Sequence, residues 1–225
     1  EKRAALLRSD SVHGDLNETV HVDTNLQALI INGMTVFVIS ASKPEDIDYT
    51  TYGIKEALII DNTGVFRDQK ALNRHLSAKG AAKVLLTAPG KGVPNIVYGV
   101  NHEEFNPDTV NIFSAASCTT NAITPILKAV EDTLGVVKGH LETIHAYTND
   151  QRLADVPHSD WRRSRAAAEN IIPTSTGAAK AVGEVLPDLK GKLHGIAARV
   201  PVPDGSVVDL FVKLGKSVTT DDVNA

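Results

Sequence analysis

The sequence is poor in cysteine, tryptophan, methionine and aromatic residues, and each shortage excludes something. Its 225 residues include one Cys, one Trp and one Met, and aromatic residues make up 4%. A single cysteine cannot form an internal disulfide, so the fold does not depend on oxidation, and we expect a reducing, cytoplasmic location. No apolar run approaches the roughly 18 residues that a membrane-spanning helix needs, and no signal-peptide pattern opens the chain. We therefore expect no membrane association, and we assign no metal ligands.

Charge gives a second set of exclusions. The formal net charge is −4, with 42% hydrophobic and 22% charged residues, which is typical of a soluble globular protein. This acidic balance argues against nucleic acid or anionic lipid as the main partner. The sequence shows no internal repeat, low-complexity segment or linker rich in proline and glycine.

The first part of the chain reads as alternating strands and helices. We expect the end of a helix at 1–7, and strands at 19–22 and 35–39 separated by a turn at Asn32-Gly33. A strand at 57–60, a helix at 67–79 and a strand at 83–87 form a βαβ unit of a parallel sheet. Further strands are predicted at 95–100 and 110–115. Ligands of open α/β sheets bind beyond the carboxyl ends of such strands, where Thr63-Gly64 and Thr87 stand.

The second part of the chain has a different pattern. Apolar residues recur at helical spacing from Ile123 to Leu134, and Gly135 ends that helix. We predict strands at 140–147, 195–202 and 206–214, and a short helix at 178–185. The change in pattern places a domain boundary near Ser117.

Cys118 stands in a polar pentapeptide, Ser117-Cys118-Thr119-Thr120-Asn121, at the start of a predicted helix. Backbone N–H groups and the helix dipole there stabilise a thiolate, and equally an oxyanion formed by attack on a carbonyl. A lone cysteine is more commonly a small buried apolar residue. The polar flanks argue against burial, and these residues alone leave the reactive thiol at roughly even odds with a core residue.

His145 is the candidate base for this thiol. It stands near the end of a predicted strand and can take a proton from sulfur and later return one to the product. The chain has eight histidines, so an ordinary strand or surface histidine is the alternative. The following residues, Ala146-Tyr147-Thr148-Asn149-Asp150, place hydroxyl, amide and carboxylate groups at one strand end, in the style of an anion site.

Five motifs, in this order and at this spacing, resemble phosphorylating glyceraldehyde-3-phosphate dehydrogenase. They are Ser117-Cys118-Thr119-Thr120-Asn121, His145-x-Tyr147-Thr148-Asn149-Asp150-Gln151, Arg162-Arg163-x-Arg165-Ala166-Ala167, Thr176-Gly177-Ala178-Ala179-Lys180 and Arg199-Val200-Pro201. Asp10-Ser11-Val12-His13-Gly14 and Asn62-Thr63-Gly64 also match, so the resemblance covers essentially the whole chain. It implies an α/β fold with a partial Rossmann-type NAD-binding domain over 1–117. A partial α+β catalytic domain with a mixed sheet follows over 118–225.

The resemblance also implies a reaction, the oxidation of D-glyceraldehyde 3-phosphate to 1,3-bisphosphoglycerate in glycolysis and gluconeogenesis. Cys118 attacks the aldehyde with His145 as its base, hydride passes to NAD, and inorganic phosphate cleaves the thioester. Thr148, Asp150 and Arg199 hold the substrate phosphate. The implied site of the attacking phosphate comprises Ser117, Thr119, Thr176 and Gly177, assisted by Arg163 or its neighbour Arg162.

The cofactor residues and the assembly are implied in the same way. Asn62, Thr63, Gly64 and Thr87 approach the nicotinamide half of NAD, and Asn149 is a further candidate; ordinary turn residues are the alternative. The loop with Arg162, Arg163 and Arg165 borders the cofactor of a neighbouring subunit, which implies a homotetramer. Taken alone, this cluster reads as a solvated charged face or a nucleic-acid patch.

The sequence also departs from the family pattern. The G-x-G-x-x-G turn that cradles the pyrophosphate is not found, and Gly90-Lys91-Gly92 does not replace it. The acidic residue that distinguishes NAD from NADP is missing with it, so that choice stays open. We interpret the sequence as a piece of a longer chain, resembling a bacterial long-form branch with an N-terminal extension. The alternatives are an erythrose-4-phosphate dehydrogenase of the same fold and a non-catalytic, nucleic-acid-binding relative.

Overall fold

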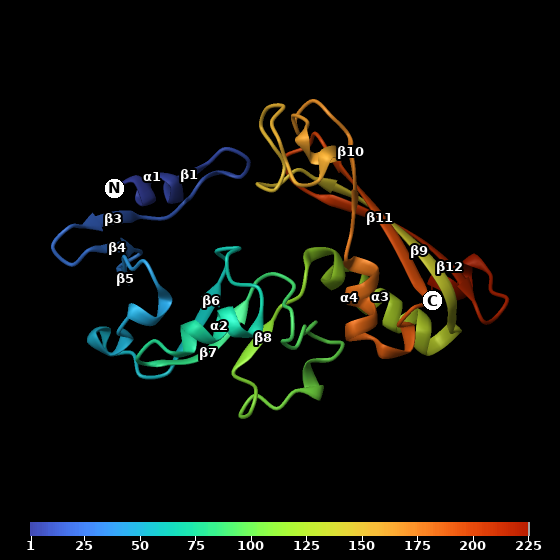
Figure 1. Cartoon of the computed structure of the whole chain (residues 1–225), viewed down its shortest axis with the longest axis horizontal. Coiled ribbons are helices and arrows are strands. Elements are labelled where there is room, and N and C mark those ends of the chain that lie inside the picture. Colours follow the sequence, from blue (N-terminus) through green and yellow to red (C-terminus); the bar gives the residue numbers. More distant parts are fainter. Residues whose placement is uncertain (225) are drawn as a thin grey trace.

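The computed structural model describes residues 1–224, which form three successive parts (Figure 1). The first part comprises α1 (Lys2–Arg8), β1 (Ser9–Asp10), β2 (Gly14–Asp15), β3 (Val20–Asp23), β4 (Ala28–Ile31) and β5 (Met34–Phe37). The second comprises η1 (Pro44–Asp46), η2 (Tyr49–Tyr52), β6 (Ala57–Asp61), α2 (Gln69–Leu76), β7 (Ala81–Leu86), η3 (His102–Glu104) and β8 (Ile112–Ser114). The third comprises α3 (Cys118–Leu134), β9 (Val136–Ala146), η4 (Trp161–Ser164), β10 (Ile172–Ser175), α4 (Ala178–Val185), η5 (Pro187–Leu189), β11 (Leu193–Val200), β12 (Ser206–Leu214) and α5 (Thr220–Asn224).

The three-stranded sheet of the first part contains one strand more than the sequence predicts, and the short paired strands β1 and β2 are a further difference from the prediction. β3, β4 and β5 form an antiparallel sheet. The Asn32-Gly33 turn, predicted to separate the strands at 19–22 and 35–39, joins β4 to β5. Both turn residues have positive φ, 49° and 80°, as tight hairpin turns of this composition require. Pattern analysis overlooks β4 because Ala28–Ile31 is a continuous apolar run without alternation.

The second part contains the predicted βαβ unit. β6, β7 and β8 are parallel, in that order, which confirms the expected parallel sheet. α2 begins after Asp68, whose side chain accepts from the Ala71 N–H, and it covers one face of the sheet. The core of this part consists of Leu72, Val84, Leu86, Val93 and Ile112.

The strand predicted at 95–100 is wrong. Only Asn95 makes a bridge, to Ser114, and residues 98–100 form a turn. The Asn101 side chain is the physical reason, because it accepts from Val97 N at 2.8 Å and donates to the Asn95 carbonyl at 3.0 Å. A side-chain amide thus occupies backbone groups that a ladder would otherwise pair.

The third part is a mixed sheet covered by α3 and α4. Its order is β10-β11-β9-β12, with β9 parallel to β11 and antiparallel to β12, so the expected mixed sheet is confirmed. Successive strands β11 and β12 are therefore not neighbours, because β9 lies between them. The two helices lie side by side in Figure 1. Their cluster with the sheet is the main core: Ile123, Leu127, Val136, Leu141, Ala178, Val182, Leu189 and Leu193. Within residues 1–224, no helix is long and apolar enough to cross a membrane.

Candidate active site

Three parallel strand ends meet at one edge. Asn62-Thr63-Gly64 follows β6, Thr87 follows β7, and Cys118 comes shortly after β8. Backbone bonds join them, because Thr87 N donates to the Asp61 carbonyl at 3.0 Å and Ala115 N donates to the Leu86 carbonyl at 2.9 Å. The structure therefore brings the candidate cofactor residues to the edge from which the chain continues to Cys118.

The turn before Cys118 is unusual. Ala116 is buried and has a φ of 57°, the left-handed region that a non-glycine residue seldom adopts. The Asn121 amide stabilises this turn by donating to the carbonyls of Ala115 and Ser117, at 2.7 and 2.9 Å. Ser117 then caps α3, because its Oγ accepts from Thr120 N at 3.0 Å. Sequence reasoning left Asn121 without a role, although its place in the pentapeptide was the available signal.

Cys118 is the first residue of α3 and its side chain is exposed. The alternative of a buried apolar cysteine is therefore wrong. Its Sγ lies 3.4 Å from Nε2 of His145, which stands at the carboxyl end of β9. The predicted thiol and its predicted base thus lie in contact, at a helix start whose N–H groups favour negative charge.

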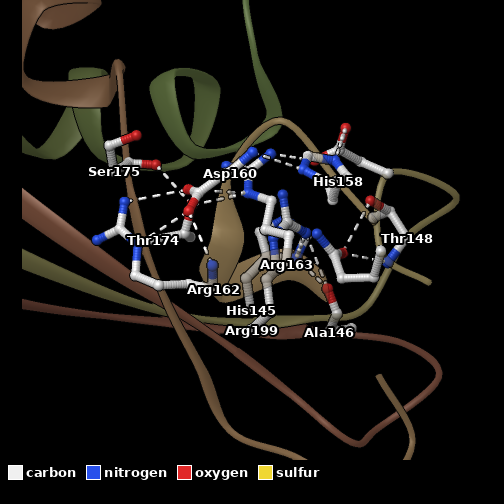
Figure 2. Close-up of polar contacts among 12 residues, drawn as sticks. His145, Ala146, Thr148, His158, Asp160, Arg162, Arg163, Thr174, Ser175 and Arg199 are labelled. Atoms are coloured by element: carbon white, nitrogen blue, oxygen red, sulfur yellow. Dashed lines mark hydrogen bonds and ion pairs between the residues drawn. The ribbon is translucent and has the colours of Figure 1, made fainter. Parts of the chain in front are cut away.

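His145 has a second neighbour that the sequence did not indicate. Arg199 Nη1 lies 2.7 Å from His145 Nδ1 and donates to the Ala146 carbonyl at 2.8 Å (Figure 2). Parallel pairing of β9 with β11 sets Arg199 directly beside His145. Because a guanidinium only donates, Nδ1 either accepts from Arg199, or carries a proton given to the Ala146 carbonyl. Nε2 faces the sulfur in both arrangements, as a donor to the thiolate in the first and an acceptor from the thiol in the second.

Arg199 is half-buried, and burial is the main cause that lowers the pKa of its guanidinium. Nearby Arg163 lowers the pKa further, whereas Cys118 and Asp150 raise it. An arginine keeps its proton under these conditions. The site therefore contains a partly desolvated positive charge within reach of the cysteine and histidine, which suits an anionic substrate group.

The three arginines of the basic loop are each paired. Arg163 forms an ion pair with Asp150 and donates from Nε to Thr174 Oγ1 at 2.9 Å. Figure 2 shows Arg162 and Arg163 beside Asp160 and Thr174. The remaining pairs join Arg162 to Asp160 at 3.0 Å and Arg165 to Asp155 at 2.9 Å. These carboxylates neutralise the loop, so the nucleic-acid alternative loses its electrostatic basis.

The remaining predicted residues of this region lie in the loop after β9 and in the first turn of α3. Thr148 donates to Gln151 Oε1 from its N–H at 2.8 Å and from its hydroxyl at 3.2 Å. Asn149 borders a cavity of about 380 Å³ together with Tyr147 and Thr148. Thr119 follows Cys118 in the first turn of α3.

Thr176 and Gly177 precede α4, and Ala178 N donates to Thr176 Oγ1 at 3.1 Å. Ile123, in the second turn of α3, and Ala178, at the start of α4, belong to one buried cluster, and the two helices contact each other. The predicted residues of the second anion site are thus distributed over the starts of two contacting helices, both suited to anions.

The candidate cofactor residues after β6 and β7 stand at a position suited to a dinucleotide. Thr63, Gly64 and Thr87 are exposed at the carboxyl ends of adjacent parallel strands, where ligands of open α/β sheets bind. Among residues 1–224, no group of three or more histidine, cysteine or acidic side chains is arranged to hold a metal ion.

These features define an α/β protein in which a parallel sheet precedes a mixed sheet, with a cysteine–histidine pair formed between the start of α3 and the end of β9. The family model for the C-terminal domain of glyceraldehyde 3-phosphate dehydrogenase matches residues 117–225, and the model for its NAD-binding domain matches residues 1–69. The chain belongs to the glyceraldehyde-3-phosphate dehydrogenase family.

Individual relatives agree with this assignment. A glyceraldehyde-3-phosphate dehydrogenase-like protein of Pseudomonas aeruginosa (strain UCBPP-PA14) is 52% identical over 99% of this chain and 48% of its own length. Glyceraldehyde-3-phosphate dehydrogenases of Geobacillus stearothermophilus and Streptomyces coelicolor are each 48% identical over 99% of this chain and 65% of their own lengths. The chain thus spans about half to two thirds of the length of these relatives.

Proposed function

We propose that the protein to which this chain belongs is a phosphorylating glyceraldehyde-3-phosphate dehydrogenase, with D-glyceraldehyde 3-phosphate and inorganic phosphate as substrates. The observation that carries this proposal is the 3.4 Å approach of Cys118 Sγ to His145 Nε2, with Arg199 against the same imidazole. A thiol nucleophile, a base and a phosphate-binding cation are the three groups that this chemistry needs from the protein.

The proposed reaction gives each of these groups a role. His145 takes the thiol proton as Sγ bonds to the aldehyde carbon, and that proton passes to the carbonyl oxygen to give a thiohemiacetal. NAD, when bound, supplies the hydride acceptor. His145 then removes the hydroxyl proton as hydride leaves carbon, which yields a thioester. Phosphate attacks this thioester, forming the acyl phosphate and returning Cys118 as a thiolate that the start of α3 stabilises.

We assign the two anion sites to the residues that the sequence predicts, with one change at Asp150. Arg199 and Thr148 hold the substrate phosphate, whereas Asp150, predicted to hold it with them, instead orients Arg163 through their ion pair. The attacking phosphate binds between the starts of α3 and α4, at Ser117, Thr119, Thr176 and Gly177, with Arg163 nearby. The half-buried Arg199 supports the first assignment, and the contact between the two helices supports the second.

The remaining features of the proposal concern the whole protein. We assign residues 1–117 to the NAD-binding domain and 118–225 to the catalytic domain, with Asn62, Thr63, Gly64, Thr87 and Asn149 on the nicotinamide side. The protein is a cytoplasmic homotetramer, in which the arginine loop borders a neighbouring cofactor. The similarity to the longer P. aeruginosa relative supports the long-form branch.

The test uses the full-length protein. We expect it to reduce NAD with D-glyceraldehyde 3-phosphate only when phosphate or arsenate is present, and Cys118→Ser to lower kcat by at least about a thousandfold. Erythrose 4-phosphate is the comparison substrate, and a higher kcat/KM for it than for glyceraldehyde 3-phosphate would support that alternative instead. Activity that persists in Cys118→Ser contradicts the mechanism. RNA affinity with no dehydrogenase activity would favour the binding-protein alternative.

A further inference from the structure

A buried histidine–aspartate pair lies behind the strand ends, outside the cysteine site. Asp61 is the last residue of β6 and its side chain is 0% exposed, while the side chain of His75 in α2 is 10% exposed. His75 Nε2 lies 2.7 Å from Asp61 Oδ2. The mechanism proposed above uses neither residue, so this contact needs its own explanation.

Asp61 connects this pair to the candidate cofactor residues. Its other carboxylate oxygen, Oδ1, accepts from both the N–H and the hydroxyl of Thr63, each at 2.8 Å. Its backbone carbonyl accepts from Thr87 N at 3.0 Å and from Thr87 Oγ1 at 3.1 Å. One residue thus fixes the threonines that follow two neighbouring strands.

His75 is itself held in one orientation. Its ring packs edge-on against Phe66, with ring centroids 4.9 Å apart and planes at 75°, and Phe66 also contacts the Arg74 guanidinium. A fully buried carboxylate is costly unless its oxygens are hydrogen-bonded. His75 satisfies the oxygen that Thr63 leaves free. Without it, Asp61 Oδ2 would have to turn towards water, and Thr63 would lose its acceptor.

We propose that His75 is a positioning residue that acts through the Asp61 carboxylate to hold Thr63 in the conformation that binds the nicotinamide side of the cofactor. It affects cofactor affinity and the order of the loop, and leaves the chemistry of Cys118 unchanged. The identity of the ligand rests on the proposed function; the effect on the loop does not.

A matched pair of variants of the full-length protein tests this. His75→Gln keeps an amide N–H at the position of Nε2, whereas His75→Asn is one methylene shorter and does not reach Asp61. We measure three quantities without aldehyde: hydrogen exchange of residues 62–64, the Kd for NAD by calorimetry, and the iodoacetamide alkylation rate of Cys118. In His75→Asn we expect faster exchange and about tenfold weaker NAD binding, the effect of one unsatisfied hydrogen bond. The alkylation rate stays within about twofold of wild type, since Cys118 lies on another element.

His75→Gln should restore both exchange and Kd to within about threefold of wild type. Wild-type exchange and affinity in His75→Asn would overturn the proposal. Equal losses in both variants, together with slow alkylation of Cys118, would overturn it as well, because they indicate a general loss of structure. If residues 62–64 exchange faster only in His75→Asn, and the wild-type protein has no dehydrogenase activity, this inference stands and the proposed function is rejected. If the wild-type protein is active and residues 62–64 exchange at the wild-type rate in His75→Asn, the proposed function stands and this inference is rejected.

Discussion

Cys118 and His145 come from different elements, and backbone geometry rather than their own side chains brings them together. Cys118 is fixed by the start of α3, and His145 by the carboxyl end of β9. His145 in turn shares the Ala146 carbonyl with Arg199. A single imidazole therefore links the nucleophile to the cation proposed to bind the substrate phosphate.

His145→Asn removes the group that faces sulfur while keeping a polar side chain on β9. We expect kcat to fall by about 10²- to 10⁴-fold, the usual contribution of a positioned acid–base group. Cys118 should also react more slowly with iodoacetamide than in the wild-type protein. His140→Asn, an exposed histidine on the same strand, is the control and should leave both rates unchanged. Equal alkylation rates in the wild-type protein and His145→Asn would show that the imidazole does not activate the thiol.

Arg199→Lys keeps the charge but loses the planar fork that meets both the imidazole and the Ala146 carbonyl. We expect KM for glyceraldehyde 3-phosphate to rise about tenfold to a hundredfold, which corresponds to one lost charge-assisted hydrogen bond. The Kd for NAD, measured by calorimetry, should not change. An unchanged KM would remove Arg199 from the substrate site.

At the residue scale, the sequence indicates which residues are functional better than it indicates which of them touch. Cys118 and His145 were found because polar flanks and a strand end distinguish them from a core cysteine and a surface histidine. The contact of Arg199 with His145 was not found, because it depends on parallel pairing between strands whose paired residues are 54 positions apart. No local pattern encodes that register.

At the scale of elements, the turn between β8 and α3 decides where the nucleophile stands. Ala116 adopts a left-handed conformation there and packs with Val97 and Val185 in a small buried cluster. Val185 is the last residue of α4, so this turn is also where the helix layer of the mixed sheet meets the parallel-sheet part.

Ala116→Val tests the importance of this turn. A β-branched residue is disfavoured at positive φ, and its two extra methyl groups overfill the cluster. We expect a loss of about 2–4 kcal/mol in the free energy of unfolding, from strain and overpacking together. Denaturant unfolding measures this loss, and the alkylation rate of Cys118 should change with it. Ala115→Val, at the preceding and less buried position, is the control. Wild-type stability in Ala116→Val would mean that the turn tolerates a second conformation.

The loop around η4 should loosen in acid. The hydrogen bond and ion pair with Arg162 lower the pKa of Asp160, whose carboxylate also caps η4. A carboxyl group with a lowered pKa stabilises the fold above its unfolded-state pKa and loses that contribution as pH falls through its folded-state pKa. We therefore expect hydrogen exchange of residues 161–164 to quicken below about pH 4, after correction for intrinsic rates. In Asp160→Asn these residues should exchange fast at every pH. Equal exchange rates in Asp160→Asn and the wild-type protein at every pH would contradict the prediction.

The sequence predicts helices and strands correctly where the apolar residues have a clear period. It fails where a side chain bonds the backbone groups of a segment, and where a strand is a continuous apolar run. The helix at 178–185 matches α4, and the stop at Gly135 is where α3 ends. The segment 95–100 has strand composition, yet Asn101 occupies its backbone groups. That outcome depends on the orientation of the Asn101 side chain, four residues after Val97, which composition does not reveal.

The two larger buried clusters of the molecule lie on the parallel sheet and on the mixed sheet, and the cluster of the third part has more residues. Leu127 is fully buried where α3 meets the mixed sheet. The sequence predicts that α3 has an apolar face, but the partners of that face follow from the strand order of the mixed sheet, which the sequence does not indicate.

Leu127→Ala creates a cavity at the centre of this core. We expect a loss of about 2–5 kcal/mol in the free energy of unfolding, the range for such truncations. Ile126→Ala, on the exposed side of the same helix, is the matched control and should cost little. Chemical denaturation of the full-length protein measures both. Equal losses in the two variants would mean that the face of α3 carrying Ile126 is covered in the full-length protein.

The strand order of the mixed sheet also has a consequence for synthesis on the ribosome. β9 carries His145 at its end, and one of its two edges is completed only by β12, with Ile144 paired to Val207. During translation this strand exists for many residues with an open edge, the kind of exposed backbone that invites pairing with another nascent chain. The surroundings of the histidine are thus completed only after β11 and β12 have been made, and long-range closure of this kind slows folding. Chaperone dependence should therefore concentrate in the interval between the emergence of β9 and that of β12.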